Sequence, residues 1–206
     1  MKELLKKILP KNSVILEAGT ANGNDTVEFG QMFPEGKIIA FEPVPHLYRA
    51  AKDKTLHLKN VALYQYALGE EKCKLPLYIS TINNNVSDSS SLLEPKEHLI
   101  FHENVKFKDV IEVDVVNLDE FCIENGISKI DFMWLDMQGY EFKMLKSSPK
   151  ILSTVTAIYT EVSLKEMYAG SELYKEYRTW LESQGFNVEL EELPWEDMGN
   201  VLFVRK

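Results

Sequence analysis

The sequence has few cysteines and few residues that break regular structure. Its two cysteines, Cys73 and Cys122, lack the C-x-x-C spacing of metal and redox sites. They therefore favour two reduced thiols over a disulfide framework. With 10 glycines and 8 prolines in 206 residues, the chain is not a low-complexity sequence. A chain of this length buries a sizeable core, which predicts a single domain.

Positive charge and long apolar runs are also scarce. The formal net charge of −9 does not attract phosphate backbones or anionic lipid surfaces. No segment reaches the roughly 20 apolar residues that span a bilayer. Lysines interrupt the N-terminal segment MKELLKKILP, which predicts a short amphipathic helix ended by Pro10 rather than a signal peptide. We therefore expect a cytoplasmic protein without nucleic-acid or membrane partners; the oligomeric state stays open.

Short apolar runs alternate with segments of helical periodicity, which is typical of stacked βαβ units. The last two runs, FNVELEEL and NVLFVRK, are separated only by PWEDMG, so they predict an antiparallel pair. The expected fold is α/β and Rossmann-like: a doubly wound, mostly parallel seven-stranded sheet with an antiparallel C-terminal strand and helices on both faces. The expected parallel strands are Val14–Ala18, Lys37–Glu42, Asn60–Leu68, Ile130–Asp136 and Thr156–Val162, and the helices between them cover residues 25–33, 46–57, 141–148 and 172–184.

The middle of the chain breaks this rhythm. Residues 80–105 are polar, include NNNVSDSSS, and exceed the roughly 12–15 residues beyond which structureless loops are uncommon. Residues 109–121, DVIEVDVVNLDEF, then predict an alternating strand that leads into a helix. We interpret residues 80–116 as a substrate-side insertion of loop and strand within one domain, residues 1–206. Ser87–Ser91 are either a mobile surface loop or a substrate lid.

The stretch VILEAGTANGNDT is the first candidate for a ligand-binding turn. Gly19 and Gly23 are four positions apart, whereas the nicotinamide fingerprint is G-x-G-x-x-G. Gly19 would let the backbone pass close to a ligand, and Gly23 would bring the next helix against the sheet. The acid Glu17 opposes a pyrophosphate here and suits a cationic ligand without phosphate, which favours S-adenosylmethionine. We expect Asn24 or Asp25 to cap the helix.

Glu42 is the second landmark, because it ends the next strand in KIIAFEP. An acid about 20 residues after a glycine turn accepts both hydroxyl hydrogens of a ribose. Pro43 and Pro45 exclude an early start of the following helix. The alternative for Glu42 is an ordinary solvated acid at the end of a strand.

Six segments, taken in order, resemble the FkbM-type methyltransferases: EAGTANGNDT, FEPVP, NVALYQYALGE, SSSLLEP, WLDMQGYEFKML and GNVLFVRK. These are class I enzymes that use S-adenosylmethionine and mostly methylate hydroxyl oxygens of small molecules and sugars. The resemblance covers nearly the whole chain, although the family's G-A-N-x-G reads G-T-A-N-G here. It implies S-adenosylmethionine as the cofactor and a small-molecule or glycan acceptor. It also implies that Glu17, Gly19, Asn22 and Gly23 line the methionine side of the cofactor, that Glu42 holds the ribose, and that Ala67 and Leu68 border the adenine.

Two acids in WLDMQGYE are candidates for catalysis. Methyl transfer to oxygen needs an in-line approach and an acceptor for the hydroxyl proton. Asp136, at a strand end, would orient the cofactor amino group or the substrate hydroxyl, or would only cap the next helix. Glu141 would take part in catalysis, or would only complement the dipole of the following helix. By the resemblance, His98 lies in the substrate segment and is a candidate base. Glu161 would face the same cleft, but with Asp136 it lacks a third oxygen ligand, so no metal is expected.

These residues predict an enzyme, an S-adenosylmethionine-dependent methyltransferase that transfers a methyl group to a hydroxyl oxygen. One alternative is a nicotinamide-dependent oxidoreductase, which the missing G-x-G-x-x-G disfavours. The other is a non-catalytic binding protein that keeps the fold and would bind the cofactor without turnover. Among the aromatic residues, Trp134 is expected in the core, whereas Trp195 lies at a loop tip where substrate could pass.

Overall fold

The computed structural model describes residues 1–206 as an α/β fold with two sheets. The strands of the larger sheet are β1 (Val14–Ala18), β2 (Lys37–Phe41), β3 (Val61–Tyr64), β8 (Phe132–Leu135), β9 (Ala157–Ser163), β10 (Phe186–Glu192) and β11 (Met198–Arg205). Their order is β10-β11-β9-β8-β1-β2-β3. The strands from β9 to β3 are parallel, and β11 is antiparallel to both of its neighbours. The predicted seven-stranded sheet is confirmed.

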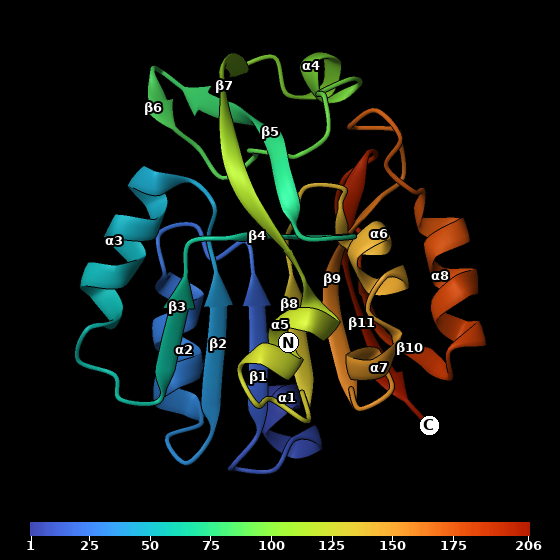
Figure 1. Ribbon diagram of the computed structural model, residues 1–206. Helices are drawn as coiled ribbons and strands as arrows, with labels where there is room; N and C mark the ends of the chain where they lie inside the picture. The colour runs from blue at the N-terminus through green and yellow to red at the C-terminus, as the bar shows by residue number, and fades with distance from the viewer.

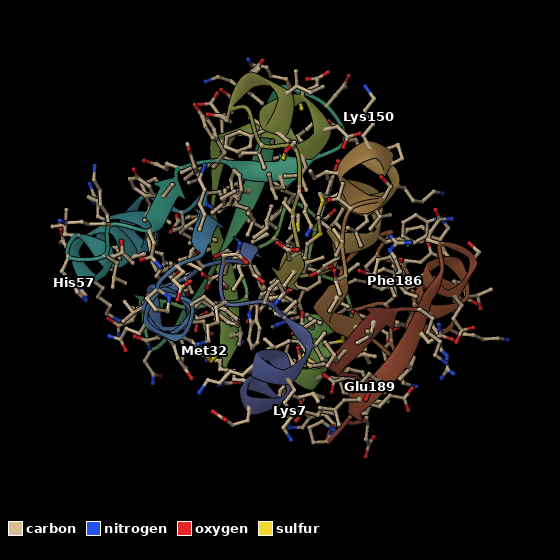
Figure 2. All side chains as sticks on the ribbon, turned by 90° about the horizontal axis from the view of Figure 1, so that it is seen from below. Lys7, Met32, His57, Lys150, Phe186 and Glu189 are labelled. Atoms are coloured by element: carbon tan, nitrogen blue, oxygen red, sulfur yellow. The ribbon has the colours of Figure 1, made fainter.

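Helices lie on both sides of this sheet, as the doubly wound prediction requires (Figure 1). Seen along the strands in Figure 2, α1 with Lys7 and α2 with Met32 lie on one side, and α7 with Lys150 lies on the other. The helix α3 packs against α2. The bounds are α1 (Lys2–Ile8), α2 (Asn24–Met32), α3 (Pro45–Thr55), α5 (Leu118–Glu124), α6 (Glu141–Lys146), α7 (Pro149–Leu152) and α8 (Tyr174–Ser183).

The two faces of the central strand β1 belong to different hydrophobic clusters. Ile15 is buried with Leu5 of α1 and Phe29 of α2. Its neighbour Leu16 is buried in a larger cluster that includes Leu145 of α6. Successive side chains of a strand point to opposite faces, so a continuous apolar run is what a strand covered on both sides requires.

The N-terminal helix forms as its amphipathic pattern predicts. Leu5 is fully buried, whereas Glu3, Lys6 and Lys7 are exposed, and Pro10 follows the end of the helix. None of the helices has the length and apolar character needed to cross a bilayer.

A second, four-stranded sheet corrects two expectations about the middle of the chain. The expected strand Asn60–Leu68 is divided: its first part is β3, whereas Ala67 and Leu68 belong to β4 (Ala67–Gly69) of the second sheet. The segment 80–105 is also not a loop throughout. It contains the end of β5 (Cys73–Ile82), the short β6 (Asn85–Val86), α4 (His98–Phe101) and the first residue of β7 (Val105–Asn117).

Pairing between β5 and β7 brings the two ends of this segment together. The two strands are antiparallel and pair from Cys73 with Val115 to Ile82 with Val105. Both alternate apolar and polar residues, and Leu77, Ile79 and Val113 are buried together on one face. The small sheet therefore covers the carboxyl ends of β1, β2 and β8 (Figure 1).

Candidate functional site

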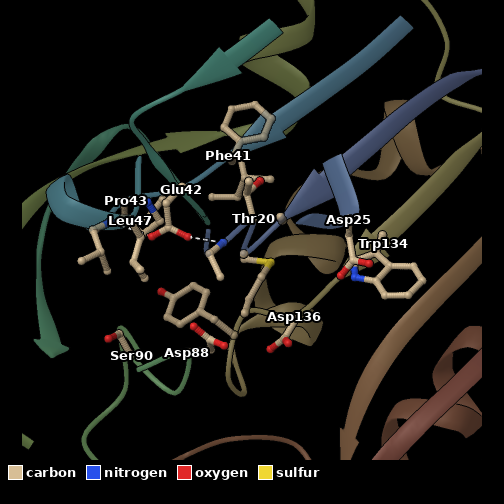
Figure 3. Close-up of a pocket in the computed structure, with 18 of the residues that line it drawn as sticks. Thr20, Asp25, Phe41, Glu42, Pro43, Leu47, Asp88, Ser90, Trp134 and Asp136 are labelled. Carbon is tan, nitrogen blue, oxygen red and sulfur yellow. Dashed lines mark hydrogen bonds between the residues drawn. The ribbon is translucent and has the colours of Figure 1, made fainter. Parts of the chain in front are cut away.

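A cavity of about 310 Å³ lies beside the carboxyl ends of β1, β2 and β8. This volume is typical of a small-molecule site, and the place is the one where doubly wound sheets bind ligands. The wall is formed by the turn after β1, the end of β2, the strand β4, the segment after β6 and the turn after β8. Figure 3 shows Glu42 and Leu47 at one end of the cavity and Asp25 and Trp134 at the other.

The two glycines of the first turn allow close backbone contacts that were not predicted. Gly19 has φ +85°, and a Cβ atom there would lie 1.8 Å from the carbonyl oxygen of Asp136. Gly23 has φ +81°, and its Cβ would lie 2.8 Å from Cα of Ala51. Gly19 thus allows the turn to approach the end of β8, and Gly23 allows α2 to approach α3 rather than the sheet.

The expected helix cap after this turn is not formed. Gly23 is the N-cap residue of α2, and no side chain caps the helix. Asn24 accepts a hydrogen bond of 2.6 Å from Lys54, and Asp25 forms an ion pair with Lys2. Asn22, Asn24 and Asp25 all lie in the cavity wall. The first turn of α2 therefore faces the cavity with polar side chains that are not used for capping.

Glu42 is a buried acid with a fixed carboxylate, so the alternative of a solvated strand-end acid is wrong. Its side chain lies in the cavity wall, and the residue is 3% exposed. Oε2 accepts the backbone N–H of Ala21 at 2.7 Å, and Oε1 accepts that of Val44 at 2.8 Å. Burial raises the pKa of Glu42 to about 8 although these two bonds oppose the shift. Each oxygen keeps a further acceptor position for a ligand hydroxyl.

The wall of the cavity carries acidic side chains and no basic ones. Asp25, Glu42, Asp88 and Asp136 line it, whereas no lysine, arginine or histidine does. Burial and the charge of Asp88 raise the pKa of both Glu42 and Asp136, the latter to about 6. A cationic ligand would relieve this repulsion between like charges, whereas a pyrophosphate would add to it.

Asp136 lies in the cavity wall directly after β8. Its backbone N–H donates to the carbonyl of Ala18 at 2.9 Å, and its Oδ1 accepts a hydrogen bond of 2.6 Å from Nε2 of Gln138. No side chain caps α6, so the alternative of a capping role for Asp136 is wrong.

Glu141 holds the turn after β8 from outside the cavity. Its Oε1 accepts the backbone N–H of Met137 at 2.6 Å, and the residue is 4% exposed. Burial raises its pKa to about 7, against the effect of this and other backbone hydrogen bonds. Glu141 therefore stabilises the turn and does not line the cavity in which a ligand would bind.

Not all predicted site residues meet at the cavity. Gly19, Asn22, Glu42, Ala67, Leu68 and Asp136 line it, but Glu17, Gly23, His98 and Glu141 do not. His98 is buried in α4 against the rings of His102, Phe107 and Tyr168. Burial lowers the pKa of His98 to about 4. His98 therefore does not reach the cavity in which a substrate hydroxyl would lie.

Several wall residues were not predicted individually from the sequence. Trp134 was expected in the core, but its indole is half-buried and lies in the wall beside Tyr159, with ring centroids 4.6 Å apart. Ser87, Asp88 and Ser90 were expected only as part of a loop or a lid. The polar run SDSS could have suggested a site, whereas nothing in an apolar strand distinguishes a wall residue from a core residue.

Glu17 of β1 lies outside the cavity wall and should make stability depend on pH. It is 1% exposed, its Oε2 has no hydrogen-bond partner, and burial raises its pKa to about 8. The unfolded chain has the ordinary carboxyl pKa of about 4.3, so folding binds a proton between these values and stability falls as the pH rises through this window.

Replacing this acid should therefore reduce the pH dependence. As the pH rises from 5 to 9, the unfolding free energy of Glu17→Gln should increase by at least about 1 kcal/mol relative to that of the wild type. Urea unfolding at both pH values measures the difference, with the exposed Glu103→Gln as the matched control. An equal loss at both pH values would contradict a buried, protonated Glu17.

The parallel sheet, the glycine turn and the acidic cavity define a class I methyltransferase. The family model described as the methyltransferase FkbM domain matches residues 17–188. The chain therefore belongs to the FkbM methyltransferase family, and it is an S-adenosylmethionine-dependent methyltransferase. This membership decides against the nicotinamide-dependent alternative.

Known proteins agree with this assignment. The 2-O-methyltransferase NoeI of Sinorhizobium fredii is 28% identical over 172 residues, which cover 82% of this chain and 71% of NoeI. Fibrillarin of Aeropyrum pernix, solved with S-adenosylmethionine, has a TM-score of 0.55 at 15% identity and is matched over 98% of this chain and 72% of its own. A Streptococcus mutans protein solved with S-adenosylhomocysteine has a TM-score of 0.52 at 16% identity, over 99% and 94%. At these identities the two structures show the fold alone.

The cavity fits the cofactor of this family. S-adenosylmethionine carries a sulfonium, an ammonium and a carboxylate group and has no phosphate, so its net positive charge suits a wall with four acidic side chains and no lysine, arginine or histidine. It also contains a ribose, for which the fixed carboxylate of Glu42 offers two free acceptor positions.

Proposed function

We propose that this enzyme transfers the methyl group of S-adenosylmethionine to a hydroxyl oxygen of a small molecule or a sugar. The observation that carries the proposal is the position of Asp136, a half-buried carboxylate in the cavity wall with one oxygen held by Gln138. A hydroxyl acceptor must lose a proton during methylation, and a carboxylate within reach can take it. The name of the relative NoeI supports an oxygen acceptor.

The cofactor would be held from two sides of the first turn. Glu42 would bind the ribose, and Ala67 and Leu68 would border the adenine; all three line the cavity. Gly19 and Asn22 would line the methionine side. Glu17 and Gly23, which the resemblance also assigned to this side, would support the turn from behind, since neither lines the cavity.

The methyl acceptor would enter beside the segment after β6. Ser87, Asp88 and Ser90 line the cavity and offer hydroxyl and carboxylate groups to a polyhydroxylated molecule. The segment is held in place, because Ser80 donates to the carbonyl of Ser87 at 2.9 Å and Ser91 donates to that of Gln138 at 2.7 Å. Residues 80–116 would in this way form the substrate side of the single domain. Nucleic acid would be repelled by the acidic wall and the net charge of −9.

The bound cofactor supplies a methyl group on a positively charged sulfur. Asp136 would orient the hydroxyl and accept its proton while the new oxygen–carbon bond forms and the sulfur–carbon bond breaks. The pKa of Asp136 is raised by burial to about 6, so the group is ionised at neutral pH yet basic enough to hold a proton briefly. The proton would then pass to solvent.

Asp136→Asn tests this role. We expect kcat to fall by about 100-fold or more, because the amide cannot accept the proton. Turnover is measured as S-adenosylhomocysteine formed with a panel of sugars and hydroxylated small molecules, and mass spectrometry locates the methyl group. The exposed Asp109→Asn is the matched control. Full turnover in Asp136→Asn, or a methyl group found on nitrogen or carbon, would contradict the proposal.

A further inference from the structure

Gln138 holds an unusual place in the turn after β8. It has φ +52°, a conformation that costs a residue with a Cβ atom free energy, and it is 6% exposed. Neither catalysis nor cofactor binding, as described above, explains why a glutamine should occupy this position. Its contacts give the reason.

The side-chain amide of Gln138 joins two acids from neighbouring strands. Nε2 donates to Oδ1 of Asp136 at 2.6 Å and to Oε2 of Glu161 at 3.0 Å. Asp136 follows β8, and Glu161 lies near the end of β9, which is parallel to β8. Both hydrogens of the amide nitrogen are thus used, each on a different carboxylate.

The other side of Gln138 is fixed just as completely. Its Oε1 accepts the hydroxyl of Tyr168 at 2.6 Å, and this hydroxyl also lies 2.9 Å from the carbonyl of Ser89. The backbone carbonyl of Gln138 accepts the hydroxyl of Ser91 at 2.7 Å. The segment that carries Asp88 is therefore connected through one residue to Asp136.

Asp136 and Glu161 are both half-buried, and two carboxylates at adjacent strand ends repel each other unless something positive lies between them. A divalent cation with oxygen ligands is one solution, and it needs at least one more oxygen donor than Asp136 and Glu161 provide. No group of three or more acidic, histidine or cysteine side chains is arranged for a metal ion. Here the two N–H dipoles of Gln138 lie between the carboxylates instead.

We propose that Gln138 is a positioning residue: its amide takes the place of a bridging cation between Asp136 and Glu161 and so holds Asp136 towards the cavity. Only the expected effect of Gln138 on turnover rests on the proposed role of Asp136. Its effects on stability and on cation binding need no acceptor and can be measured whether or not oxygen is the atom methylated.

Two substitutions of Gln138 separate this role from simple packing. Gln138→Glu adds the missing third carboxylate, so we expect Mn²⁺ to bind at least ten times more tightly than to the wild type, as measured by electron paramagnetic resonance. In EDTA the melting temperature of Gln138→Glu should be lower than that of the wild type. Addition of Mn²⁺ should raise it by at least about 5 °C. Gln138→Met keeps the length and removes both donors, so it should melt at least about 5 °C lower with or without Mn²⁺.

The controls are the wild type and Gln31→Glu, which adds the same charge on the exposed part of α2. Neither should respond to Mn²⁺ or EDTA. Wild-type stability in Gln138→Met would overturn the proposal, as would a Gln138→Glu protein that ignores Mn²⁺ or fails to fold in its presence. Stoichiometric Mn²⁺ binding to the wild type would also overturn it.

Discussion

Glu42→Ala is expected to weaken the binding of S-adenosylhomocysteine by at least about 100-fold, equivalent to about 2.7 kcal/mol. The substitution removes the acceptor for the ribose hydroxyls. It also leaves the backbone N–H groups of Ala21 and Val44 without the partners that fix the turn beside the cavity. Leaving a buried backbone donor without its partner costs about 1–3 kcal/mol, so the damage to the turn adds to the loss of the ribose contact.

Calorimetric titration with S-adenosylhomocysteine and, separately, with NAD measures the effect. The exposed Glu35→Ala, in the turn before β2, should bind like the wild type. Circular dichroism and a melting curve verify that Glu42→Ala is folded at the titration temperature. Affinity within threefold of the wild type would contradict the ribose role of Glu42. Binding of NAD without S-adenosylhomocysteine would contradict the account of the cavity as a whole.

Gly19→Ala is expected to lower the unfolding free energy by about 4 kcal/mol or more. Two costs add. The residue has φ +85°, which is strained for any side chain, and the new Cβ would lie 1.8 Å from the backbone oxygen of Asp136. Backbone on both sides of the clash must shift, so the cavity between β1 and β8 should be disrupted as well.

Gly126→Ala is a matched control for this substitution. Gly126 has φ +64°, but a Cβ there meets nothing within 4 Å, so only the conformational cost of about 1 kcal/mol remains. Urea unfolding of both variants separates the clash from the dihedral strain. Equal losses in the two variants would show that the contact between Gly19 and Asp136 is not tight.

The sequence by itself determined the main sheet. Each of its parallel strands is a short apolar run, and helical periodicity or a turn separates it from the next. Local pattern therefore sufficed for β1, β2, β8 and β9, and for the antiparallel C-terminal pair. It also placed Gly19, Glu42 and Asp136 at the site, because the carboxyl ends of parallel strands meet at one edge of a sheet.

The tertiary structure alone decided how the second sheet completes the site. The pairing of β5 with β7 joins residues far apart in sequence, and an alternating strand does not specify its partner. The same limit applies to side chains. An apolar pattern predicts that Trp134 is in contact with other residues but not that a cavity lies beside it. An acid near the end of a strand, such as Glu17 within β1 or Asp136 after β8, can face a cavity or the interior. Gln138 depends most on the fold, since Glu161 of β9 and the loop residues Tyr168 and Ser91 come within hydrogen-bond distance of it only on folding.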